Sequence, residues 1–288
     1  PRDNGTIYYH KCDSYFMDIK QLTSNTTKNT LISGVKGYYF YVKQTGSVID
    51  YWTNWWSMPL YNIVNFSCLL SKINEIDGDF RIRFMTSHPK DCSDELLHTM
   101  SRCKKVSRHL HLPFQSGNDR VLNLMNRKYT RQKYLSRIKL ARSLMPDISL
   151  TSDIIVGFPG ETYDEFKDTL SLVREVQFSA LFTFIYSKRN GTPAAKMDDP
   201  VSREEKGKWF RELLAVQEEV SKNNDKKMAN KTYRLLCDDF GRADGYMAGH
   251  TDGNVCFEFL GDASLLGKFV TVETYLEDNI LKAKLKEN

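Results

Sequence analysis

The chain has 288 residues, which suits one large α/β domain with a small second domain. Because 41% of the residues are hydrophobic and 27% are charged, the chain can bury a core, and this composition excludes a disordered tail. The net charge of +5 permits an anionic partner. No apolar run approaches the roughly 18–20 residues of a membrane span, so we expect no membrane partner. Six dispersed cysteines and the lack of a signal-peptide pattern favour a reduced, cytoplasmic protein, which we expect to be a monomer.

Residues 1–63 differ from the rest of the chain and form a divergent or degenerate N-terminal segment. They are rich in Tyr, Trp, Asn and Thr and poor in helical periodicity. Residues 35–43 predict a strand. The aromatic cluster at residues 51–56 fits neither a helical nor a strand period. Such a cluster can stack on RNA bases, but irregular packing is the interpretation we favour.

A regular alternation of helices and strands begins at residue 64 and continues to residue 227. Alternating elements of this kind form βα units with parallel strands. A closed eight-unit barrel needs roughly 250 residues, so this shorter rhythm predicts a partial (βα) barrel in an α/β fold. The expected helices are 66–76, 120–125, 130–145, 161–176 and 202–227, with a further helix that begins at residue 93, and the expected strands are 81–85, 106–112, 148–156 and 180–186.

The pattern changes near the C-terminus. A polar run at residues 223–225 is the expected linker, and residues 228–288 form the expected second domain. Four short strand-like runs are separated there by six glycines, which predicts a small β-barrel. Those runs are residues 232–237, 255–259, 269–274 and 280–285.

Ligands of parallel βα proteins bind at the carboxyl ends of the strands, so the loops at those ends are candidate sites. The first such loop begins at Asp153 and ends in a helix after Glu161. Gly157 and Gly160 allow close approach of a ligand to the backbone, and the helix N-terminus offers free N–H groups. The alternative is a tight turn closed by a capping box at residues 162–165. That alternative accounts for Gly160 but not for Asp153 or Glu161.

A second loop follows the strand that contains His109 and His111. Alternation places both histidines on one face of the strand, where they could share a metal or form a polar barrel interior. The residues Cys92, His98 and Cys103 are close in sequence, but their spacing matches no zinc module. We therefore expect no metal site here.

Two further loops follow strands. Residues 86–91 include Ser87 and are polar and stiffened by proline, which suits a binding loop or a solvated turn. Residues 186–193 are basic, and such a loop faces phosphate or is merely solvated.

Together, and in this order, these loops resemble the radical S-adenosylmethionine methylthiotransferases. The nearest likeness is to the MiaB type, the tRNA methylthio-isopentenyladenosine synthases. The runs that carry it are RIRFMTSHPKD (81–91), HLHLPFQSGNDRVLNLMNRKYT (109–130), SLTSDIIVGFPGETYDEF (149–166) and FTFIYSKRNGTPAA (182–195). The run GHTDGNVCFEFLGDASLLGKFV (249–270) looks like the TRAM domain of the family, an RNA-binding β-barrel.

The resemblance implies a radical-SAM-type barrel that binds S-adenosylmethionine and a 4Fe-4S cluster, with a second cluster that delivers sulfur to an adenosine beside the anticodon of tRNA. It implies contacts with RNA or substrate for Arg127 and Arg189. It also implies a pocket for S-adenosylmethionine, whose residues would be Ser87, Gln115, Asp153, Gly157, Gly160, Glu161 and Tyr186.

The chain departs from the family at one point. Members hold the cluster with a CxxxCxxC motif in the first βα unit, because three thiolates leave the fourth iron open. That unit should lie within residues 1–60, where the sequence has only Cys12. We therefore expect an N-terminally incomplete member that keeps the pocket and the RNA module but is inactive alone.

The charge distribution bears on RNA binding. Residues 228–288 carry a net charge of −3, which leaves +8 on residues 1–227, so the partial barrel should provide most of the phosphate contacts.

Two alternatives to a methylthiotransferase stay open. In the first, the chain is a non-catalytic RNA-binding protein derived from this family. In the second, it is an unrelated βα-barrel enzyme that uses His109 or His111.

Overall fold

A computed structural model of the chain describes the backbone of residues 6–11, 30–33 and 38–42, and describes residues 65–85 and 87–286 in full. The aromatic cluster expected at residues 51–56 lies outside the described residues. No helix within the described ranges is long and apolar enough to cross a membrane.

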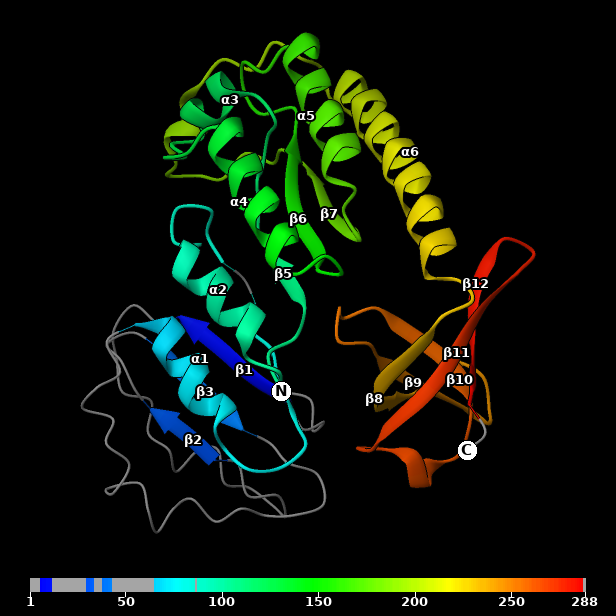
Figure 1. Cartoon of the computed structure of the whole chain (residues 1–288). Coiled ribbons are helices and arrows are strands. Elements are labelled where there is room, and N and C mark those ends of the chain that lie inside the picture. The colour runs from blue at the N-terminus through cyan, green and yellow to red at the C-terminus, as the bar shows by residue number, and fades with distance from the viewer. Residues whose placement is uncertain (1–5, 12–29, 34–37, 43–64, 86, 287–288) are drawn as a thin grey trace.

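Parallel strands form an open, partial barrel (Figure 1). Strand β1 (Thr6–Lys11) pairs in parallel with β4 (Arg81–Ile82), and its other edge pairs with β3 (Tyr38–Val42), which is followed in the sheet by β2 (Thr30–Ser33). A parallel bridge from β4 to Val106 leads to β5. The remaining sheet has the order β5 (His109–His111), β6 (Ser149–Val156) and β7 (Ala180–Ile185), with all strands parallel.

The predicted strands are present, although two of them are shorter than the apolar runs. The run 81–85 forms regular pairing only at β4, and the run 106–112 only at β5. Backbone bonds continue beyond these strands, because the amide of Ser87 donates to the carbonyl of His111 at 3.0 Å. The two segments therefore still lie side by side up to the start of the loops.

Six helices among the described residues flank the strands, and each begins at a polar side chain that accepts a backbone hydrogen bond. At Thr162 the expected capping box with Glu165 is confirmed. The helices are α1 (Phe66–Asn74), α2 (Asp94–Arg102), α3 (Asp119–Leu124), α4 (Arg131–Leu144), α5 (Tyr163–Val176) and α6 (Arg203–Met228). A short 3-10 helix, η4 (Pro193–Lys196), precedes α6.

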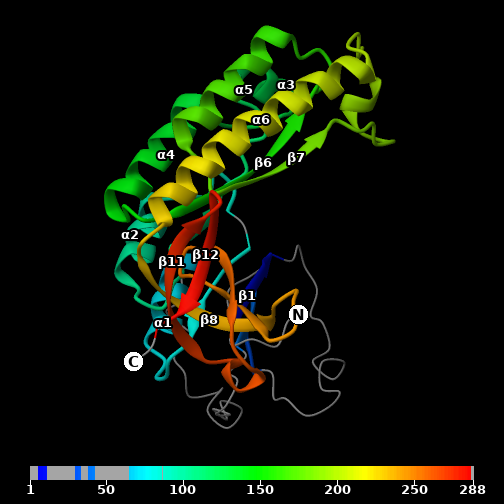
Figure 2. The same ribbon diagram turned by 90° about the vertical axis from the view of Figure 1, so that its right-hand side faces the viewer.

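The expected linker at residues 223–225 is wrong, because α6 continues through it to Met228. The side-chain amide of Asn224 donates to the backbone carbonyl of Phe178 at 3.1 Å, so this last part of the helix still packs on the barrel. Figure 2 shows α6 running beside β6 and β7 and leading to the C-terminal sheet.

Alternation along β6 separates two faces of the sheet. Ser152, Ile154 and Val156 are buried toward the helices, where the main apolar core lies. Thr151 and Asp153 point to the opposite, inner face, which is the face that encloses the site described below.

The C-terminal part is a five-stranded antiparallel sheet with its own apolar core, as expected for a small β-barrel. The two strands at the ends of the order, β10 and β12, also contact each other, so the sheet is strongly curled. Its strands are β8 (Thr232–Phe240), β9 (Tyr246–His250), β10 (Cys256–Leu260), β11 (Phe269–Glu277) and β12 (Ile280–Leu285), with the 3-10 helix η5 (Ala263–Leu265) before β11.

The turn between β9 and β10 docks against the barrel. The guanidinium of Arg81 is buried and donates to the carbonyl of His250 at 2.7 Å. It also lies 3.8 Å from the carboxylate of Asp252. Gly253 packs so close that a Cβ there would be 3.1 Å from the Cβ of Ser149. This contact fixes the curled sheet beside the amino-terminal end of the partial barrel.

Candidate functional site

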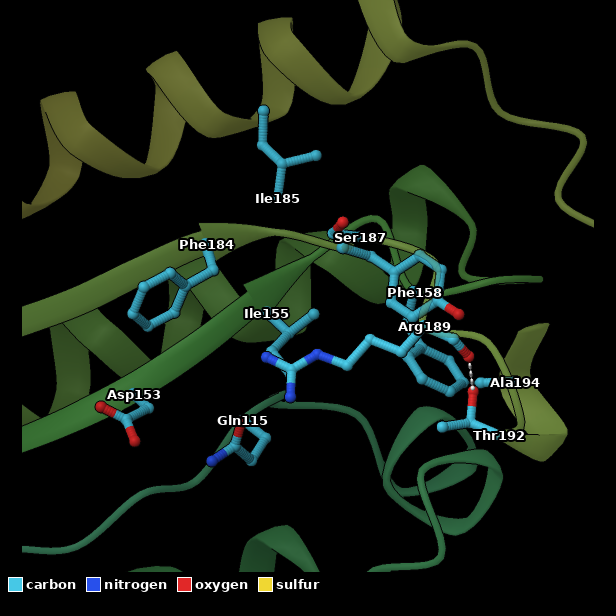
Figure 3. A pocket seen from close by; sticks show the side chains of 11 residues that line it. Gln115, Asp153, Ile155, Phe158, Phe184, Ile185, Ser187, Arg189, Thr192 and Ala194 are labelled. Atoms are coloured by element: carbon cyan, nitrogen blue, oxygen red, sulfur yellow. Dashed lines mark hydrogen bonds between the residues drawn. The ribbon is translucent and has the colours of Figure 1, made fainter.

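A pocket of about 470 Å³ opens at the carboxyl ends of β6 and β7, where parallel βα folds place their ligands (Figure 3). It combines apolar and aromatic walls with a few polar groups. Its lining residues are Gln115, Asp153, Ile155, Phe158, Phe184, Ile185, Tyr186, Ser187, Arg189, Thr192 and Ala194.

Gln115 and Asp153 are held in the pocket by backbone pairing. Gln115 has a φ of 64°, a left-handed conformation that is uncommon for a residue with a side chain. Its amide donates to the carbonyl of Asp153 at 3.0 Å, and its own carbonyl accepts from Ile155 at 3.0 Å. The segment after β5 therefore continues beside β6 and brings an amide and a carboxylate to the same site.

The loop after β7 supplies the opposite wall. Tyr186 packs edge-on against Phe158, with 5.3 Å between the ring centroids. Arg189 extends across the pocket in Figure 3, and its carbonyl accepts from the hydroxyl of Thr192 at 2.8 Å. The expectation for Arg189 was contact with RNA or substrate, and the structure places its side chain in the predicted cofactor pocket.

The loop from Gly157 to Glu161 packs beside the pocket, and of its residues Phe158 is the one that lines it. Glu161 turns inward and is only 2% exposed. Its Oε2 accepts from the amides of Gly157 at 2.7 Å and Phe158 at 3.1 Å. Desolvation by burial raises the pKa of this carboxyl from 4.5 to about 7, against the lowering effect of the two amides.

The two glycines of this loop have different roles. Gly157 has a φ of 70°, and a Cβ there would be 2.6 Å from the aliphatic stem of Lys206. Gly160 has a φ of 78° and open space around it. The close approach that the sequence suggested at Gly157 is therefore made by Lys206 of α6. Lys206 is itself buried and paired with Asp199 at 2.5 Å.

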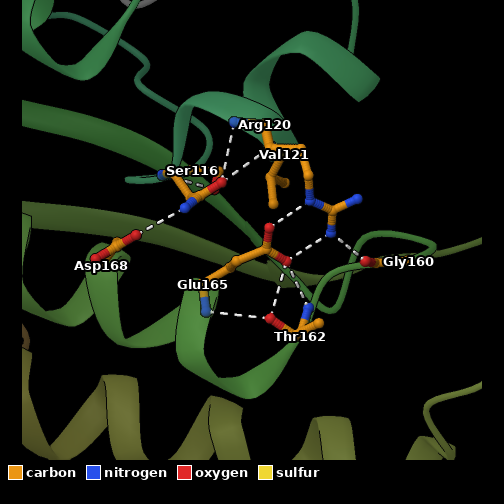
Figure 4. Close-up of polar contacts among 8 residues, drawn as sticks. Ser116, Arg120, Val121, Gly160, Thr162, Glu165 and Asp168 are labelled. Carbon is orange, nitrogen blue, oxygen red and sulfur yellow. Dashed lines mark hydrogen bonds and ion pairs between the residues drawn. The ribbon is translucent and has the colours of Figure 1, made fainter.

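An ion pair ties the outer side of the same loop to α3 (Figure 4). Arg120 forms a two-pronged pair with Glu165, in which Nη2 is 2.6 Å from Oε2. The same nitrogen donates to the carbonyl of Gly160 at 2.6 Å. The hydrogen bond from Arg120 to the carboxylate of Glu165 lowers the pKa of Glu165 to about 2. The Glu165 side chain also accepts from the backbone of Thr162, so the turn before α5 is fixed from both sides.

The predicted site residues fall into two groups. The pocket brings together Gln115, Asp153, Tyr186 and Arg189. Five others do not line it, and they are Ser87, Arg127, Gly157, Gly160 and Glu161. The Nη1 atom of Arg127 instead lies 3.4 Å from the Nε2 atom of His88.

The apolar pocket wall was missed because its residues are unremarkable in sequence. Phe158 and Phe184 have no polar chemistry to attract notice. The register of β7 on β6, with Phe184 opposite Ile155, is the signal that could have placed Phe184 on the inner face.

The two histidines of β5 do lie on one face, as alternation predicts, and they share a hydroxyl. His109 Nε2 and His111 Nδ1 are each 2.9 Å from Thr151 Oγ1. In residues 65–85 and 87–286, no group of three or more His, Cys, Asp or Glu side chains is arranged to hold a metal ion. Cys92 is buried among apolar side chains, and desolvation raises its pKa to about 12.

Two buried polar atoms beside the pocket have no hydrogen-bond partner among the described residues, Tyr186 Oη and Glu161 Oε1. Buried polar groups are normally paired, so unpaired ones next to a pocket indicate a site shaped for a polar ligand. The partial barrel and this pocket therefore define a ligand-binding protein of the βα-barrel class.

Comparison with known proteins agrees with this class. The Radical SAM superfamily matches residues 56–173. The chain is 47% identical over 225 residues to a tRNA-2-methylthio-N(6)-dimethylallyladenosine synthase of Acetivibrio thermocellus, covering 76% of this chain and 47% of that protein. It is 44% identical over 220 residues to the synthase of the same name from Alkaliphilus oremlandii, again covering 76% and 47%.

Residues 56–173 therefore match a Radical SAM domain, and both of these curated homologues are tRNA-2-methylthio-N(6)-dimethylallyladenosine synthases. It spans about half the length of the curated relatives that it matches. Among solved structures, coproporphyrinogen III oxidase (HemN) from Escherichia coli, a radical SAM enzyme, has a TM-score of 0.45 at 17% identity, covering 69% of this chain and 51% of that one.

The family implies two bound groups, S-adenosylmethionine and an iron–sulfur cluster, and the described residues fit only the first. The pocket, with its carboxylate, amide, guanidinium and unpaired hydroxyl, suits a polar nucleoside such as S-adenosylmethionine. The described cysteines do not fit an iron–sulfur cluster, because Cys68, Cys92, Cys103, Cys237 and Cys256 are dispersed and form no ligand group.

Proposed function

We propose that the chain binds S-adenosylmethionine in the pocket at β6 and β7 and acts on tRNA as part of a methylthiotransferase. The reaction would add a methylthio group to an N6-dimethylallyl (isopentenyl) adenosine beside the anticodon. The observation that carries the proposal is the pocket itself, which joins a carboxylate, an amide and a guanidinium with aromatic walls in a chain of this family. A tRNA substrate agrees with the expected cytoplasmic location, and we keep the expectation of a monomer.

The pocket residues can hold each part of this ligand. S-Adenosylmethionine, when bound, supplies a sulfonium centre that is cleaved reductively. The carboxylate of Asp153 can accept hydrogen bonds from an ammonium or from ribose hydroxyls, and Arg189 can pair with the ligand carboxylate. Gln115 can donate and accept, while Phe158 offers a flat surface to a purine.

The substrate base has a second aromatic surface beside the pocket. Phe182 and Phe184 are 54% and 55% exposed on the inner face of β7, although both are large and apolar. Exposed aromatic rings on a concave face are typical of a surface that stacks on nucleobases. A dimethylallyl group adds apolar area that these rings can cover.

We further propose that this chain alone does not complete the reaction. Cluster binding in the family needs a cysteine triplet, and residues 1–60 contain only Cys12. Anaerobic reconstitution with iron and sulfide tests this directly. A 4Fe–4S absorbance band with cleavage of S-adenosylmethionine would contradict the proposal, whereas RNA binding without a cluster supports it.

Binding of an anticodon stem-loop tests the RNA assignment. We expect a stem-loop in which this adenosine carries the N6-dimethylallyl group to bind more tightly than one with unmodified adenosine. Phe182→Ala with Phe184→Ala should remove the preference. Leu214→Ala is the matched control, because Leu214 is 44% exposed on the outer helix α6. Equal affinity of the wild-type chain for both stem-loops would refute the substrate assignment.

A further inference from the structure

Four side chains form a continuous row on the inner face of the partial barrel and end in the pocket. His109 Nε2 and His111 Nδ1 each lie 2.9 Å from Thr151 Oγ1. His111 Nε2 lies 3.4 Å from Asp153 Oδ1. The row therefore runs from His109 through Thr151 and His111 to the pocket carboxylate.

Thr151 links the two histidines, because its hydroxyl lies within hydrogen-bond distance of both rings and can donate to one while it accepts from the other. The ring of His111 is thereby held at Nδ1, and its other nitrogen faces the carboxylate of Asp153. The row therefore fixes the position of the His111 ring beside Asp153.

The row is largely shielded from solvent. Thr151 is 8% exposed and the side chain of His111 is 13% exposed. Desolvation by burial, with Arg83 and His111 nearby, lowers the pKa of His109 to about 4. Phe182 of β7 packs edge-on against His111, with 5.7 Å between the ring centroids. The charged groups that face the row are thus Arg83 at one end and Asp153 at the other.

We propose that Thr151 and His111 are positioning residues that keep the carboxylate of Asp153 oriented for the ligand. This inference rests on the proposed function, because it takes S-adenosylmethionine as the occupant of the pocket. The hydroxyl of Thr151 holds the ring of His111 at Nδ1, and Nε2 of the same ring lies beside Asp153 Oδ1. Without the hydroxyl the ring can turn, and the carboxylate loses the neighbour that keeps it in place.

The experiment compares Thr151→Val, which removes the hydroxyl at nearly constant volume, with Thr151→Ser, which keeps it. Calorimetry measures the affinity of the 288-residue chain for S-adenosylmethionine at neutral pH. We expect Thr151→Val to weaken binding about five- to tenfold, the effect of one aligned hydrogen bond, and Thr151→Ser to stay within about twofold.

A second readout does not depend on the ligand. In the chain labelled with 15N-histidine, the signals of His111 are assigned by their loss in His111→Phe. We expect Thr151→Ser to keep the wild-type signals of His111, because the hydroxyl still holds Nδ1. Thr151→Val should shift the Nδ1 signal, because it removes the hydrogen-bond partner of that nitrogen. Circular dichroism confirms that each variant is folded.

The outcomes separate the inference from the proposed function. If Thr151→Val leaves both the 15N pattern and the affinity unchanged, or if Thr151→Ser is impaired equally, the row has no positioning role. If the 15N patterns are as expected but the folded wild-type chain does not bind S-adenosylmethionine, the proposed function fails and the ligand role of Asp153 fails with it.

Discussion

The carboxyl group of Glu161 provides a quantitative test of the loop beside the pocket. It is 2% exposed, and burial raises its pKa from 4.5 to about 7 even though two backbone amides donate to it. A carboxyl whose pKa is raised by folding binds a proton more tightly in the folded state. The free energy of unfolding must therefore fall as the pH rises from about 4.5 to about 7.

The expected size follows from the two values. A tenfold change in proton binding corresponds to about 1.4 kcal/mol, so the difference between 4.5 and about 7 gives about 3 kcal/mol. Glu161→Gln keeps an acceptor for Gly157 and Phe158 but cannot ionise. We expect this variant to be more stable than the wild-type chain by about 1 kcal/mol at pH 5 and by about 3 kcal/mol at pH 8.

Urea unfolding followed by circular dichroism between pH 5 and pH 8 measures the difference. Glu165→Gln is the matched control on the same turn, because the hydrogen bond from Arg120 lowers the pKa of Glu165 to about 2. The stabilising contribution of the Glu165 carboxylate is fully present above pH 4.5 and is lost only as the pH falls toward 2. The effect of Glu165→Gln on stability should therefore be constant between pH 5 and pH 8. A difference between wild type and Glu161→Gln that does not change with pH would refute the assignment.

Three other predictions concern packing and the contact between the two parts of the chain. Arg81→Met removes a buried donor to the carbonyl of His250 and should cost about 2–3 kcal/mol in urea unfolding. Gly117→Ala places a Cβ 2.5 Å from a backbone oxygen of α5 and should cost more than about 2 kcal/mol, whereas Gly207→Ala has space in helix α6 and should stabilise by about 0.5–1 kcal/mol. A hydrogen bond to Asp238 raises the pKa of His250 to about 9, so the cost of Asp238→Asn should be full below pH 6.5 and disappear as the pH rises through 9. Equal costs of the two glycine substitutions, or a cost of Asp238→Asn that does not depend on pH, would contradict these accounts.

Local patterns predicted most of the fold correctly. The apolar run at residues 148–156 forms β6, and the periodic stretch at residues 202–227 forms α6 with only one residue of difference at each end. The capping box at Thr162 is present because its two partners are three residues apart and need no distant contact. The linker at residues 223–225 was wrong, since a polar run near the end of a long helix looks the same as a linker, and the contact of Asn224 with Phe178 is not visible in the sequence.

The site was only partly predictable, because its details depend on distant contacts. Asp153 and Gln115 could be placed from the strands that precede them. The inward turn of Glu161 depends on the amides of its own loop, and the need for glycine at position 157 comes from Lys206, which is almost 50 residues away in sequence. The row through Thr151 required the register between β5 and β6, which no single strand pattern contains.

Calorimetric titration of S-adenosylmethionine into the folded chain tests the central claim most directly. The account predicts saturable binding to one site, weakened at least tenfold by Asp153→Asn, because a carboxylate that meets a cationic ligand is lost. Lys222→Gln, on the exposed side of α6 where Lys222 pairs only with its helix neighbour Glu218 among the described residues, should bind as the wild-type chain does. Absence of binding by a well-folded sample, or unchanged affinity in Asp153→Asn, would contradict the claim that this pocket holds the nucleoside.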